Sequence, residues 1–107
     1  MTIAKPVVSK FGGSSLADAG QFRKIDYIIK QNPNRRYIVP SAPGKRNPDD
    51  VKVTDLLYAC YDKAKHGEPY EEYLNQIRQR YQEIIEELGL HLSLKDELKV
   101  LENSFVR

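Results

Sequence analysis

The sequence predicts an α/β fold in which a parallel βαβ unit is followed by a helical hairpin. Two short β-branched segments, residues 6–11 and 37–39, enclose a stretch with apolar residues at helical spacing. Residues 70–88 then carry one long apolar stripe, which is typical of a helix. Because a single helix joins the two strands, we expect a right-handed crossover and parallel strands.

The first strand is expected over residues 6–11, because a Gly-Gly pair follows it directly. Ser15, with Asp18 three residues later, is a variant of the capping box and predicts the start of the first helix. The helical pattern stops at residues 32–34, which read Asn-Pro-Asn. The apolar residues that define this helix are Leu16, Phe22, Ile25, Ile28 and Ile29.

A long loop separates the second strand from the next helix. Residues 40–50 contain three prolines, one glycine and six polar residues. Loops of this length inside compact domains are usually functional or disordered. Thr54 and Asp55 are suited to cap the helix that follows, which we expect to end near His66.

The last third of the chain is predicted to be a helical hairpin. Pro69 stands where a first helical turn tolerates proline, and Gly89 ends the helix. Ser93 then resembles another capping residue. The apolar stripe of the first helix is Tyr70, Tyr73, Leu74, Ile77, Tyr81, Ile84, Ile85 and Leu88, and that of the second is Leu94, Leu98, Leu101 and Phe105. We therefore divide the chain into an N-terminal part, residues 1–66, and a helical part, residues 67–107.

Composition excludes several classes of protein. In 107 residues, 17 Lys and Arg against 15 Asp and Glu give a net charge of +2, too little for a nucleic-acid-binding face. No apolar stretch approaches the roughly 20 residues of a membrane span, and no leader is recognisable, so we expect a cytoplasmic protein without membrane contacts. One Cys and two His cannot form a disulfide or a structural zinc site, and no metal ligands are assigned.

The junction after the first strand has the chemistry of a phosphate site. Lys10 supplies a positive charge, and Gly12 and Gly13 let backbone N–H groups approach phosphate oxygens closely. Ser14 and Ser15 add hydroxyl donors. The alternative is a plain Gly-Gly turn with a capping serine and a surface lysine.

Two further segments are candidates for the same site. Ser41 to Gly44 follow the second strand, and parallel strands would bring this turn to the edge that carries the Gly-Gly pair. The start of the helix at Thr54 is suited to bind a carboxylate. The alternatives are an ordinary Pro-Gly turn and a capping threonine.

These three segments together resemble the aspartate kinases. Residues 7–18, Val-Val-Ser-Lys-Phe-Gly-Gly-Ser-Ser-Leu-Ala-Asp, resemble the N-terminal signature of that family. Residues 39–44 resemble its strand ending in Ser-Ala, and residues 53–57 resemble its hydrophobic-Thr-Asn/Asp-Leu-Leu segment. The resemblance implies the N-terminal part of an amino-acid-kinase-type αβα sandwich, followed by a helical excursion. The loop at residues 44–52 is longer than in many relatives.

The resemblance also implies a reaction. An aspartate kinase transfers the γ-phosphoryl group of ATP to the β-carboxylate of L-aspartate, with Mg²⁺ bridging the phosphates, and gives 4-phospho-L-aspartate for lysine, threonine and methionine biosynthesis. Lys10 would be catalytic, by stabilising charge on the phosphoryl group in flight. The implied binding residues are Lys10, Phe11, Gly12, Gly13 and Ser14 for the ATP phosphates, and Ser41 and Thr54 for aspartate.

The resemblance places other parts of the machinery beyond Arg107: a substrate-gripping Glu, an organising Asp, the rest of the sheet and the regulatory modules. We therefore expect an incomplete kinase that is inactive alone, from a homo-oligomeric parent enzyme. Two alternatives stay open. One is another kinase of the same fold, acting on glutamate or acetylglutamate, and the other is a non-catalytic helical interaction module.

Overall fold

The computed structural model describes residues 5–105, and their contacts divide the chain into two units. The first unit runs to Lys52 and the second begins at Val53. The elements in chain order are β1 (Val7–Phe11), the short 3₁₀ helix η1 (Gly13–Leu16), α1 (Ala19–Lys30), β2 (Arg35–Pro40), α2 (Val53–Lys65), α3 (Glu71–Glu87) and α4 (Lys95–Phe105). None of these helices is long and apolar enough to cross a lipid bilayer.

The first unit contains a two-stranded parallel sheet, which confirms the predicted βαβ arrangement. Lys10 of β1 stands opposite Val39 of β2, and Phe11 stands opposite Pro40. Strand β2 begins at Arg35, two residues earlier than predicted. Charged residues can extend a strand at an exposed end because the backbone alone supplies the ladder hydrogen bonds.

Helix α1 packs its apolar side into a small core with the end of β1. Phe11, Leu16 and Ile25 are buried there, and Phe22 and Ile29 pack against them. All but one of the residues predicted to define the apolar side of this helix therefore contribute to burial. The exception is Ile28, which remains 39% exposed.

The predicted start of α1 is wrong by several residues. Ser15 lies inside η1, and its backbone N–H donates to the carbonyl of Gly12 at 3.1 Å. The capping residue is Asp18, whose carboxylate accepts from the backbone N–H of Gln21 at 2.9 Å, so that α1 begins at Ala19. The serine is held in the 3₁₀ turn and therefore cannot take the position before the helix.

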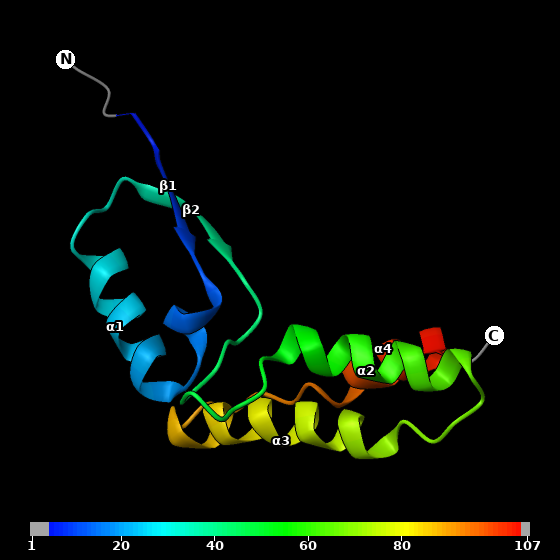
Figure 1. Ribbon diagram of the computed structural model, residues 1–107. Coiled ribbons are helices and arrows are strands. Elements are labelled where there is room, and N and C mark those ends of the chain that lie inside the picture. The colour runs from blue at the N-terminus through cyan, green and yellow to red at the C-terminus, as the bar shows by residue number, and fades with distance from the viewer. Residues whose placement is uncertain (1–4, 106–107) are drawn as a thin grey trace. The chain divides into compact units, whose positions relative to one another are not determined.

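The second unit consists of three helices, in which α2 packs against both α3 and α4 (Figure 1). Leu56 and Cys60 of α2 are buried, as are Leu74 and Ile77 of α3. Every residue of the stripe predicted for α3 is buried or half-buried. Contacts place α2 in the second unit, where α3 and α4 pack against it. The division after residue 66 stays a prediction.

Glycines end α2 and α3 as predicted. Gly67 and Gly89 adopt φ values of +68° and +67°, in the left-handed region that favours glycine. After α2, the N–H of Glu68 donates to the carbonyl of Lys63 at 2.8 Å. An equivalent hydrogen bond, between residues five positions apart, follows α3. This Schellman motif satisfies carbonyl groups that a helix end would leave unpaired.

Candidate functional site

The structure brings the two predicted turns of the first unit together. Because β1 and β2 are parallel, the segments that follow them leave the same edge of the sheet. The backbone N–H of Ser41 donates to the carbonyl of Phe11 at 2.9 Å. One step further on, the N–H of Gly44 donates to the carbonyl of Gly13 at 2.8 Å. The ladder between the strands thus continues into the turns.

The two turns touch backbone to backbone at Gly13 and Gly44. A Cβ atom on Gly44 would lie 2.6 Å from the carbonyl carbon of Gly13 and 2.9 Å from the backbone nitrogen of Ser14. A Cβ on Gly13 would lie 3.0 Å from the carbonyl oxygen of Ala42. Gly44 therefore requires glycine because a side chain there would clash with backbone, and a side chain at Gly13 would be tightly packed. Sequence reasoning found each glycine but not their contact.

Most of the proposed phosphate-binding residues face solvent. Lys10, Gly12 and Ser14 are exposed, and Gly13 is half-buried. Phe11 differs, because its ring is buried in the core and only 8% exposed. Any contact between Phe11 and a phosphate would therefore have to use its backbone. The predicted α-helix start at Ser15 is also wrong at this site, since η1 begins at Gly13 itself and runs to Leu16.

The two residues predicted to bind aspartate lie in different units. Ser41 is exposed in the first unit, directly after β2. Thr54 is half-buried in the second unit. It lies within the first turn of α2, which begins at Val53, and therefore does not precede the helix as a capping residue would. Its role in binding stays a prediction.

The loop after Gly44 is closed by its own ion pair. The carboxylate of Asp50 accepts from Nε of Arg46 at 2.7 Å and from Nη2 at 3.0 Å, and also from the backbone N–H of Arg46 at 2.9 Å. This side-chain pairing with Arg46 holds the pKa of the Asp50 carboxyl far below its usual range, although partial burial opposes it. Because both the backbone and the side chain of Arg46 donate to the Asp50 carboxylate, residues 46–50 form a compact ring.

We expect Asp50→Asn to destabilise the chain at neutral pH and to have less effect in acid. A carboxyl whose pKa is lowered by folding contributes stability above its unfolded pKa, near 4, and loses it as the pH falls toward the folded value. Urea unfolding should show a loss of about 1 kcal/mol at pH 7 that shrinks below pH 4. The exposed neighbour provides the control, since Asp49→Asn should show no such difference at either pH.

Comparisons with known proteins assign this arrangement to a family. No family model matches the chain. Over 92 residues it is 40% identical to aspartokinase 3 of Bacillus subtilis, an alignment that covers 86% of this chain and 20% of that protein. It superposes on the crystal structure of Clostridium acetobutylicum aspartate kinase with a TM-score of 0.90 and 47% identity, covering 95% of this chain and 24% of that one. The chain belongs to the aspartokinase family.

A third relative has been crystallised with ligands. Escherichia coli aspartokinase III, in complex with aspartate and ADP, matches with a TM-score of 0.71 and 33% identity, covering 92% of this chain and 21% of that one. This aspartokinase chain spans about one fifth of the length of the curated relatives it matches. The resemblance predicted from the three motifs is therefore confirmed at the level of the family.

The described part of this aspartokinase chain offers no protein cage for a metal. Nowhere in residues 5–105 do three or more His, Cys, Asp or Glu side chains gather in a way that could hold an ion. The acidic residues near the turns are engaged elsewhere: Asp50 pairs with Arg46, and Asp18 caps α1.

Proposed function

We propose that this chain supplies part of the ATP-phosphate and aspartate sites of an aspartokinase. The observation that carries the proposal is the hydrogen bond between Gly44 and Gly13, which joins two turns at the sheet edge where β1 ends, one residue after Lys10. The reaction is the transfer of the γ-phosphoryl group of ATP to the β-carboxylate of L-aspartate. The sheet would be completed as an αβα sandwich by the rest of the enzyme.

Phosphoryl transfer requires that the substrates are positioned and that positive charge is supplied. The attacking carboxylate is ionised at neutral pH, so no general base is needed. Negative charge on the oxygens of the moving phosphoryl group has to be balanced. Lys10 is suited to that role, and the backbone of Gly12 to Ser14 can approach phosphate oxygens closely. Ser41 and Thr54 would hold aspartate.

Magnesium would enter with the nucleotide in this proposal. Kinases use Mg²⁺ that bridges ATP phosphates, with only one or two protein carboxylates in support. The part of this chain would be to bind phosphate.

A substrate comparison tests the proposal. ADP release by a full-length aspartokinase that contains this chain should depend on L-aspartate and should be much slower with L-glutamate or N-acetylglutamate. A preference for glutamate would assign the chain to another amino-acid kinase. The chain of residues 1–107 alone should release no ADP with either substrate.

Thr54→Ala in the full-length enzyme should raise the KM for aspartate and leave the KM for ATP nearly unchanged. Loss of one hydroxyl contact to a charged substrate corresponds to an increase of about 3- to 10-fold. Thr54→Ser keeps the hydroxyl and should behave like the wild type. An effect confined to the KM for ATP would contradict the assignment of Thr54 to the aspartate site.

A further inference from the structure

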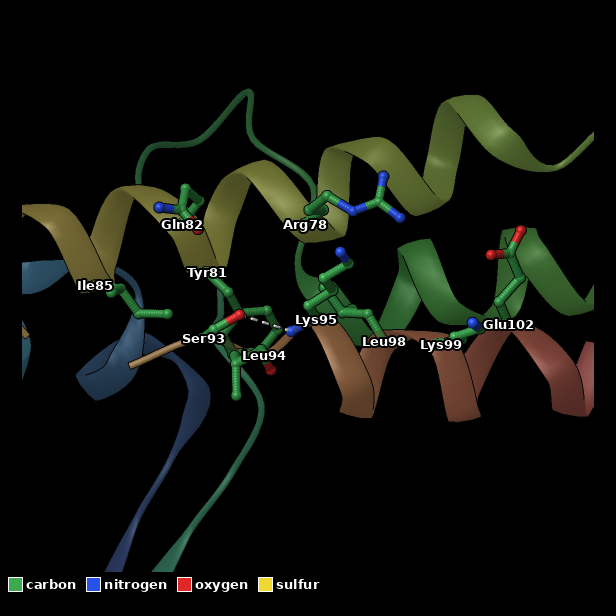
Figure 2. Close-up of a pocket in the computed structure, with 10 residues that line it drawn as sticks. All are labelled: Arg78, Tyr81, Gln82, Ile85, Ser93, Leu94, Lys95, Leu98, Lys99 and Glu102. Atoms are coloured by element: carbon green, nitrogen blue, oxygen red, sulfur yellow. Dashed lines mark hydrogen bonds between the residues drawn. The ribbon is translucent and has the colours of Figure 1, made fainter. Parts of the chain in front are cut away.

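A cavity of about 600 Å³ lies between α3 and α4 within the second unit (Figure 2). Cavities that bind small organic molecules have volumes of this order. The main helix contacts of the unit are those of α2 with α3 and of α2 with α4. The cavity is therefore flanked by two helices that share a packing partner.

Each helix contributes one face to the cavity. Arg78, Tyr81 and Ile85 lie at helical spacing on α3. Leu98 lies on α4, where Lys95 and Lys99 also line the cavity. Ile85 is buried, whereas Tyr81 and Leu98 are half-buried, so the lining has an apolar floor. Figure 2 shows these side chains on facing stretches of the two helices.

The rim of the cavity is positively charged. Arg78, Lys95 and Lys99 are exposed there. Neither lysine forms an ion pair within residues 5–105. The only acidic residue of the lining, Glu102, accepts a hydrogen bond from the Tyr70 hydroxyl at 3.1 Å. An apolar floor beneath an excess of cations is complementary to a molecule with an apolar body and an anionic end.

We propose that this cavity binds an amphipathic organic anion, namely an aliphatic carboxylate. Its hydrocarbon chain would cover Tyr81, Ile85 and Leu98, because burial of apolar surface provides most of the affinity of small-molecule sites. Its carboxylate would lie between Lys95 and Lys99, whose flexible stems allow the ammonium groups to reach it from the rim. The proposal concerns the second unit only and does not depend on the kinase reaction.

Calorimetric titration of the full chain with decanoate tests the proposal. Decanoate should bind at one site per chain, and decyltrimethylammonium, which has the same hydrocarbon chain and the opposite charge, should bind at least tenfold more weakly. Absence of decanoate binding would overturn the proposal. Equal binding of the two probes would also overturn it, because the cavity would then be a simple apolar groove.

Charge variants locate the site. Lys95→Gln with Lys99→Gln should weaken decanoate binding about fivefold, as expected for the loss of two exposed ion pairs. The matched control is Lys24→Gln with Lys52→Gln, which removes two exposed lysines that do not line the cavity and should leave binding unchanged. All four positions are exposed, so the variants should keep the wild-type circular dichroism spectrum. Equal weakening in both double variants would overturn the proposed site.

Discussion

Lys10→Ala in a full-length aspartokinase containing this chain should lower kcat by about 10²-fold or more and change the KM for aspartate little. Lys10 ends the exposed part of β1, directly before the buried Phe11 and the glycine turn. A cation at that point would stabilise negative charge that develops only as the phosphoryl group moves. Steady-state ADP release at varied aspartate and ATP concentrations measures both constants.

A matched lysine separates this effect from a general loss of charge. Lys24 is exposed on α1, and Lys24→Ala removes the same charge without touching either turn. Its kcat should remain within about twofold of the wild type, since surface substitutions have small effects. An unchanged kcat in Lys10→Ala would remove Lys10 from the catalytic role.

Gly44→Ala should strongly destabilise the first unit. The added methyl group would lie 2.6 Å from the carbonyl carbon of Gly13, and the atoms in its way belong to backbone that cannot rotate aside. The turns would have to separate, which breaks the hydrogen bond from Gly44 to Gly13. We expect the free energy of unfolding to fall by about 2–3 kcal/mol, as for overpacked sites. Urea unfolding measures the change.

The neighbouring turn provides a control for that substitution. A Cβ on Gly12 would meet no atom within 4 Å, and the backbone there has φ −74° and ψ 172°, which any residue adopts. Gly12→Ala should therefore leave the free energy of unfolding within about 0.5 kcal/mol of the wild type. Equal destabilisation by both substitutions would show that the close contact at Gly44 is not what makes that position sensitive.

Much of the fold follows from residue patterns. A β-branched run before the Gly-Gly pair predicted the first strand, and a short apolar run predicted the second. The predicted stripe of α3 is covered along its whole length. Glycine after the last apolar residue predicted where α2 and α3 end, because the left-handed conformation needed there is strained for other residues. These signals are local, so they can be found without knowing what packs against them.

Sequence patterns are insufficient where two local signals compete or where packing decides. Ser15 and Asp18 are both good capping residues, and only the 3₁₀ turn at Gly13–Leu16 determines that the aspartate caps α1. The grouping of α2 with the helical unit depends on which element covers Leu56 and Cys60. Helical periodicity shows that such a side is apolar, but it does not show which partner covers it.

The candidate site, too, could be predicted from the sequence only in part. Motifs alone indicated Lys10, the Gly-Gly pair and the Ser41 turn, and the parallel pairing brings the two turns to one edge. The contact of Gly13 with Gly44 could not be found that way, because it joins residues far apart in the chain. The signal that could have indicated this contact is that each of the two turns expected at one sheet edge contains a glycine.

The ring formed by Arg46 and Asp50 has a consequence for how this loop can change in evolution. Asp50 also donates its backbone N–H to the carbonyl of Asn47 at 3.1 Å, and the N–H of Asp49 donates to the Asn47 side chain at 3.0 Å. Several of the hydrogen bonds of the loop are thus made between its own residues. Because hydrogen bonds within the loop help to hold it together, we expect that it can be lengthened, shortened or exchanged between relatives as one unit. Gly44 would keep its contact with Gly13.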